Sequence, residues 1–134
     1  MLSRRALLGW SLGVLGLAQA QSPDAQHLKA CEILVEHALK AYNAGDWQDF
    51  YRDFSERVRS HCSEQSFHSV YLESGYKQVG SYRSRQLISE RSSLQAPAGL
   101  LVYRAQFSRC PATLSVNLVW EGGSWKILQI RIDP

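Results

Sequence analysis

The sequence lacks a basic stripe. It has 15 Lys and Arg against 12 Asp and Glu, and Arg83, Arg85 and Arg91 are interleaved with Ser and with Glu90. Arg4 and Arg5 lie in a segment that we expect to be removed, which leaves 13 basic against 12 acidic residues. Because nucleic-acid binding requires clustered cations that neutralise phosphates, the sequence argues against a nucleic-acid partner.

A hydrophobic run long enough to span a bilayer is also lacking. Residues 6–18 are uncharged and rich in Leu and Gly, but they are too few to cross easily. With the preceding arginine pair and a small-x-small pattern at Ala18-Gln19-Ala20, residues 1–20 are predicted to be a signal peptide cleaved before Gln21. The alternative is an uncleaved N-terminal anchor. We expect an exported protein, periplasmic or secreted, with no membrane anchor after signal removal; Sec and twin-arginine export both stay open.

Cysteine is scarce, and the C-x-x-C spacing typical of zinc sites is missing. We therefore predict no metal, and no motif indicates a cofactor. In an oxidising compartment Cys31, Cys62 and Cys110 allow one bridge and three pairings. Cys31 falls on the apolar stripe of an expected helix, where a small buried hydrophobe is the simpler interpretation. This favours a disulfide between Cys62 and Cys110.

What the sequence does contain is the pattern of one folded domain. Of its 134 residues, 45% are hydrophobic and 20% charged, which is ordinary globular usage. Residues 21–25 are expected to be a flexible end. Apolar residues then recur at helical spacing up to Gly45, and a second amphipathic helix is expected from Asp46 to about Val58. Ser63 is expected to cap a third helix ending at Gly80.

After Gly80 the period changes to alternation, which predicts strands. A polar strand is expected over 82–92 and a stronger one over 100–107, with 92–99 as a loop. Residues 114–120 alternate, and Gly122-Gly123 predicts a hairpin turn that returns at Trp125. The fold class is therefore α+β: N-terminal helices packed on a curved four-stranded antiparallel sheet.

Three segments together resemble the NTF2-like, or cystatin-like, superfamily. They are Ala44-Gly45-Asp46-Trp47, Gly80-Ser81-Tyr82 and the final hairpin around Trp120-Glu121-Gly122-Gly123. The resemblance extends over residues 26–134 and is strongest to small exported bacterial domains of unknown function. It implies a cone of helices wrapped by a bent sheet. Its members include isomerases, dehydratases, ligand binders and assembly modules, so the fold does not select the function.

Candidate site residues fall into two groups. His68 and Tyr71, three apart on one helix, and Asp53 are candidate acid/base groups for an enzyme of this fold. Aromatic residues are candidates for a ligand pocket in the cone, although ordinary core packing is their default role; they are Tyr42, Trp47, Phe54, Tyr71, Tyr103 and Trp120.

No strong catalytic motif is present, so the first hypothesis is a non-enzymatic domain that binds a small apolar ligand or a protein partner. The alternative is a small lyase or isomerase with acid/base residues inside the cone. In a third hypothesis the cone is filled and the sheet mediates assembly, for example as a homodimer. This last hypothesis expects Leu100, Val102 and Val119 to be partly exposed on the outer sheet face.

Overall fold

The computed structural model describes residues 24–134. The expected signal peptide and most of the expected flexible end lie outside these residues. The chain begins with α2 (Ala25–Ala44), whose first amides are capped by the side chain of Asp24. Gly45 ends α2 with φ 69°, in the left-handed conformation that a glycine adopts without strain. The predicted first helix is thus present.

The second predicted helix is wrong in its extent. Asp46 caps α3 (Trp47–Phe50), which is only four residues long, and a separate 3₁₀ helix, η1 (Glu56–His61), follows. Between them the chain turns at Tyr51–Asp53 and then forms a β-bridge at Phe54: the Ser55 amide donates to the Ile127 carbonyl at 2.8 Å, and the Ile127 amide donates to the Asp53 carbonyl at 2.9 Å. Pairing with a distant strand therefore replaces the helix that local periodicity predicted.

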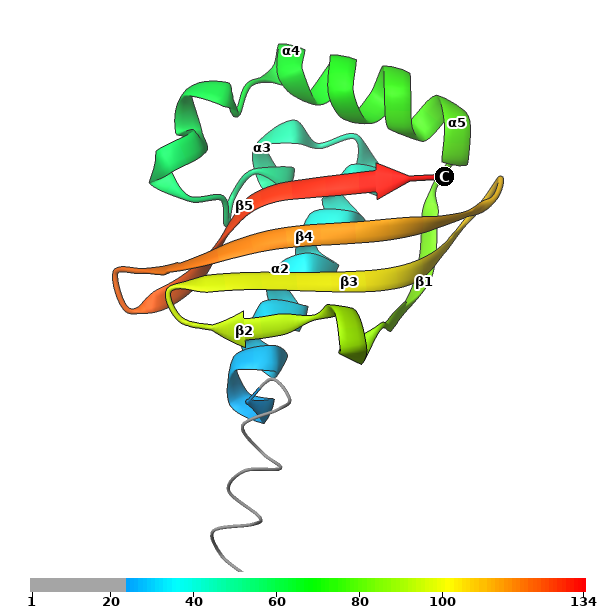
Figure 1. The fold of residues 1–134 in the computed structure, drawn as a ribbon. Helices are drawn as coiled ribbons and strands as arrows, with labels where there is room; N and C mark the ends of the chain where they lie inside the picture. Colours follow the sequence, from blue (N-terminus) through cyan, green and yellow to red (C-terminus); the bar gives the residue numbers. More distant parts are fainter. Residues whose placement is uncertain (1–23) are drawn as a thin grey trace, which may run out of the picture.

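The third helix matches its prediction. Ser63 and Ser66 form a reciprocal capping box at its start. It is built from α4 (Glu64–Ser66), the π-helical η2 (Phe67–Tyr76) and α5 (Lys77–Val79), and it ends at Gly80. In Figure 1 this helix runs alongside the last strand of the sheet.

The sheet is antiparallel and has five strands rather than four. β1 (Tyr82–Leu87), β3 (Ala98–Phe107), β4 (Pro111–Glu121) and β5 (Ser124–Asp133) lie in the order β1-β3-β4-β5 (Figure 1). The additional strand, β2 (Ser93–Gln95), follows the 3₁₀ turn η3 (Ser89–Arg91) and pairs with β3. It lies inside the segment that was expected to be a loop.

The core lies between α2, the third helix and one face of the sheet. Alternate residues of β3 and β4 contribute to it as predicted: Leu101, Tyr103, Ala105 and Phe107, then Leu114, Val116 and Leu118. Phe50 is packed against neighbouring aromatic rings, with the Tyr71 centroid at 4.6 Å and the Phe67 centroid at 5.0 Å. This packing fills the space between the third helix and the sheet.

The expectation about the outer face of the sheet is wrong for two of its three residues. Val102 is 2% exposed and Val119 is 4% exposed within the monomer, although neither belongs to the main core. Leu100 is 37% exposed. The side chains of Val102 and Val119 are thus already covered within the monomer. The three residues do not form the contiguous exposed apolar patch that assembly through this face requires.

Candidate functional site

Most of the aromatic pocket candidates lie in the packed core. Tyr42, Phe54, Tyr71 and Tyr103 are each no more than 8% exposed, while Trp47 is half-buried. Trp120 is 37% exposed and lies apart from them, 5.2 Å from the ring of His27 near the start of α2. The structure therefore brings four of the six candidates into the core and places Trp120 at the hairpin.

The hydroxyls of Tyr42 and Tyr71 have backbone partners. Tyr42 Oη donates to the Gly80 carbonyl and Tyr71 Oη to the Ile130 carbonyl, each at 2.8 Å. Burial raises the pKa of both hydroxyls. Each hydroxyl thus joins two elements and stays neutral at ordinary pH.

The acid/base candidates do not converge. The His68 side chain is 61% exposed and has its Nδ1 3.5 Å from a carboxylate oxygen of Glu73, whereas the Tyr71 hydroxyl is buried against β5. Asp53 pairs with the neighbouring Arg52 at 3.0 Å. Catalysis requires such groups to meet at one place, and these three residues point to different surroundings.

The cysteines are free, and the expected pairing does not fit the fold. Cys62 precedes the third helix and donates to the Val58 carbonyl, whereas Cys110 lies 4.0 Å from the Gln78 carbonyl at the other end of that helix. At about 1.5 Å of rise per helical residue the two ends are separated by well over 10 Å. A disulfide needs Cα atoms within about 7 Å, so Cys62 and Cys110 cannot be bridged within one chain without rearrangement.

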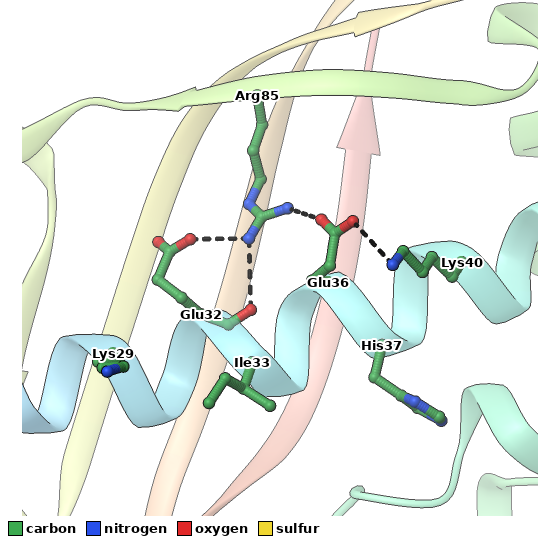
Figure 2. Close-up of a pocket in the computed structure, with 7 residues that line it drawn as sticks. All are labelled: Lys29, Glu32, Ile33, Glu36, His37, Lys40 and Arg85. Carbon is green, nitrogen blue, oxygen red and sulfur yellow. Dashed lines mark hydrogen bonds and ion pairs between the residues drawn. The ribbon is translucent and has the colours of Figure 1, made fainter.

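A groove along the exposed side of α2 is the candidate site. Its volume is about 470 Å³ and it is lined by Lys29, Glu32, Ile33, Glu36, His37, Lys40 and Arg85. Six of these residues are on α2, and Arg85 reaches across to them from β1 (Figure 2). The helical period of α2 places the six on neighbouring turns of one face. Sequence reasoning missed this site because it followed only the apolar residues of this helix, and the polar residues between them carry no local signal for a site.

The guanidinium of Arg85 occupies the centre of the groove wall, and its side chain is only 10% exposed. It donates to Glu32 Oε2 at 2.7 Å and to Glu36 Oε1 at 2.5 Å, and also to Tyr82 Oη at 2.8 Å. Tyr103 Oη donates to the other oxygen of Glu32 at 2.5 Å. These bonds join β1, β3 and α2 in one charge-assisted network.

The network affects the pKa values of Arg85 and Tyr103. Burial alone would lower the pKa of Arg85, but the hydrogen bonds to Glu36 and Glu32 outweigh that effect and raise it. Burial, followed by the hydrogen bond to the Glu32 carboxylate, raises the pKa of Tyr103. Arg85 therefore remains charged and Tyr103 neutral, and neither is suited to exchanging a proton near neutral pH.

The rim of the groove carries groups with more freedom. The Lys40 side chain is 75% exposed and lies 3.8 Å from Glu36, and Lys29 is also exposed. Ile33, between them on α2, is 60% exposed. His37 Nε2 lies 2.9 Å from Asp49 Oδ1 of α3. Exposed ammonium groups beside an apolar side chain can hold an anion that has an apolar body.

Within residues 24–134 no cluster of three or more His, Cys, Asp or Glu side chains is arranged to hold a metal ion. In the same part of the chain no helix has the length and apolar character needed to cross a membrane.

Comparison with known proteins places the fold. The sequence matches no family model and no curated protein. Among solved structures, it is similar to an NTF-2 like protein of unknown function from Shewanella oneidensis MR-1, with 12% identity and a TM-score of 0.54 over 80% of this chain and 98% of that one.

A second NTF-2 like protein of unknown function, from Silicibacter pomeroyi DSS-3, is 18% identical, with a TM-score of 0.54 over 81% of this chain and 97% of that one. A SEC-C motif containing protein from Rhodopseudomonas palustris gives 12% identity and a TM-score of 0.51 over 77% of this chain and 88% of that one. The chain thus has an NTF2-like fold, an α+β domain with a curved antiparallel sheet, which confirms the expectation from the sequence. At these identities the likeness defines the fold and leaves the chemistry to the site.

Proposed function

We propose that this chain is an exported, non-enzymatic binding domain whose contact site is the groove along α2. One observation carries the proposal: the two terminal nitrogens of the Arg85 guanidinium are engaged with carboxylates of α2. Arg85 is hydrogen-bonded to both Glu32 and Glu36. The side chains available to contact a ligand are therefore those at the rim, Lys29, Ile33 and Lys40.

This arrangement favours binding over catalysis. An acid/base catalyst needs two groups that can take up and release protons within reach of one substrate. The Arg85 network instead holds its protons firmly and connects three elements, which makes the groove a rigid wall. Rigid walls lower the entropy lost on binding.

The ligand class follows from the rim. Lys29 and Lys40 are eleven positions apart on α2, or about 16 Å along its axis, and Ile33 lies between them. The groove is open and shallow, with a volume of about 470 Å³, so it suits a small ligand that lies along its surface. The proposed ligand is therefore a small amphipathic anion whose apolar body covers Ile33 and whose carboxylate pairs with a rim lysine.

The test is an NMR titration of the ¹⁵N-labelled protein with octanoate and, separately, with neutral octanamide. Octanoate is expected to shift the amides of α2 between residues 29 and 40, and octanamide to bind more weakly. Lys40→Gln and Ile33→Ser should each weaken octanoate binding by about threefold or more. Lys77→Gln, which removes an exposed lysine from α5, is the matched control. Shifts that map elsewhere, or no shifts at all, would reject this site.

Export is the other part of the proposal and rests on the sequence of residues 1–20. The protein recovered from the extracytoplasmic fraction of its own cells is expected to begin at Gln21 when its intact mass is measured. A full-length mass in the membrane fraction would favour the uncleaved anchor instead.

His37 and Asp49 support a second candidate, a small lyase or isomerase. His37 Nε2 lies 2.9 Å from Asp49 Oδ1 at the edge of the groove but makes no hydrogen bond there. The imidazole would have to reorient before the carboxylate could orient it as a general base. In this function His37→Gln would abolish turnover without weakening octanoate binding. In a binding domain no turnover is detected, and the same variant changes the octanoate dissociation constant by no more than about twofold.

A further inference from the structure

The edge of β5 is closed over its first half and open over its second. β5 is the last strand in the sheet order, so one of its sides has no strand neighbour along its full length. Near Ile127 that side is covered, because the Asp53 carbonyl accepts a hydrogen bond from the Ile127 amide and the Ser55 amide donates one to the Ile127 carbonyl. Past the bulge at Leu128, the Tyr71 hydroxyl bonds the Ile130 carbonyl.

Alternation then locates the remaining edge groups. Since the Ile130 carbonyl points to the open side, the amide and carbonyl of Ile132 point there too, whereas those of Arg131 point to β4. Among the described residues no hydrogen bond outside the sheet ladders involves the Ile132 backbone. An open edge of this kind is a template for pairing with another strand.

The structure also provides space beside this edge. A groove of about 350 Å³ separates β5 from the third helix. The helix side includes two small residues, Ser74 and Gly75, and the strand side runs from Gln129 to Ile132. Val70, on the same helix, is 53% exposed. The small side chains of Ser74 and Gly75 leave room for an extended backbone near Ile132, whereas Tyr71 reaches across the groove to the Ile130 carbonyl.

We propose that the occupant is β5 of a second copy of this chain, paired antiparallel about a two-fold axis at Ile132. Ile132 then faces its own counterpart, and the two residues exchange both of their backbone hydrogen bonds. In this register each Ile130 faces a Pro134, which has no amide hydrogen to donate. The Ile130 carbonyl does not need that donor, because Tyr71 already supplies one.

Charge complementarity supports the same register. Arg131 and Asp133 lie on one face of β5, with Arg131 Nε 3.0 Å from Asp133 Oδ2. About an axis at Ile132, each Arg131 stands directly opposite the Asp133 of the partner. The dimer would gather two positive and two negative side chains in alternation, and opposite charges facing each other across strands are stabilising.

Sedimentation velocity over a range of protein concentrations tests the proposal. Arg131→Asp and Asp133→Arg should each raise the dimer dissociation constant by about tenfold or more, because each places like charges opposite one another. The double variant Arg131→Asp/Asp133→Arg should recover most of the loss. Arg83→Asp, the same charge change on β1 at the opposite edge, is the control and should leave the dimer unchanged.

A backbone measurement accompanies the charge swap. In hydrogen exchange, the Ile130 and Ile132 amides should become protected as concentration rises, while the amides of α2 do not change. A protein that remains monomeric at millimolar concentration overturns the proposal. A dimer whose dissociation constant is changed by neither single charge reversal also overturns it. None of these variants lies in the α2 groove. A negative result for the dimer therefore leaves the proposal of octanoate binding untouched, and the two proposals are tested independently.

Discussion

Replacing Arg85 with Met should destabilise the domain more than any comparable change on β1. Met keeps much of the side-chain volume but removes every hydrogen bond of the guanidinium. Glu32 and Glu36 are then left next to each other, one turn apart on α2, without the cation that they share. Two like charges at this spacing repel each other.

The burial of the three side chains sets the magnitude. Removing one partner of a fully buried pair costs ~3–5 kcal/mol, and an exposed pair contributes ~0–1 kcal/mol. The Arg85 side chain is 10% exposed, but Glu32 and Glu36 are 32% and 40% exposed, so water can resolvate the carboxylates. We therefore expect an intermediate loss of about 2 kcal/mol in the free energy of unfolding.

Urea unfolding followed by tryptophan fluorescence measures this loss, because Trp125 is buried and reports on the core. A loss of about 2 kcal/mol corresponds to a midpoint lower by roughly 1 M and a melting temperature lower by about 10 °C. Arg83→Met, on the exposed side of the same strand, should change stability by no more than about 0.5 kcal/mol.

The triple variant Arg85→Met/Glu32→Gln/Glu36→Gln should regain at least half of the loss, since no carboxylate is then left uncompensated. If Arg85→Met is no more destabilising than Arg83→Met, the network does not hold β1 to α2, and the reasoning is refuted.

Three further predictions follow from particular contacts. Burial, with a smaller effect of Glu32, raises the pKa of the Cys31 thiol from 9.0 to about 12. As pH rises, the folded state thus retains this proton longer than the unfolded state, and the free energy of unfolding should fall between about pH 9 and pH 12. Plotted against pH, it should fall less steeply in Cys31→Ala. Equal slopes in the two proteins would contradict this prediction. With a thiol reagent at pH 8, Cys31 should react at least about tenfold more slowly than Cys110 in the native protein, because the thiolate is the nucleophile. In denaturant the two cysteines should react at the same rate. Equal rates in the native protein would exclude a buried Cys31. Glu121→Ala should lower the free energy of unfolding by about 1–2 kcal/mol, because it removes both carboxylate oxygens that accept from the fully buried Ser55 hydroxyl at 2.9 Å. Lys126→Ala should lower it little in the same chemical denaturation experiment. Equal losses in the two variants would show that this hydrogen bond is not the cause.

The parts of the fold that were predictable from the sequence are those set by neighbouring residues. The apolar period of α2, its end at Gly45 and the alternation of β3 and β4 each need only a short window of sequence. The hairpin at Gly122 and Gly123 is equally local, since both residues have positive φ, at 61° and 84°.

The parts that were missed depend on distant partners. The β-bridge at Phe54 depends on pairing with Ile127, which no local pattern indicates. The groove depends on contacts of Arg85 with Glu32 and Glu36, 53 and 49 positions away. From the sequence these residues had only the pattern of a polar strand and the solvated face of a helix, so the signal for a site exists only once the chain has folded.

The same long separations have a consequence for the order of folding. α2 is the first described element to be synthesised, yet Glu32 meets Tyr103 71 positions later, and His27 accepts from Trp125 98 positions later, in β5. Contacts so far apart in sequence close slowly, because a large loop must be ordered before they form. The nascent chain therefore has no complete core until β5 has been made, and a translocation channel that accepts only unfolded chains would have that whole interval in which to engage it.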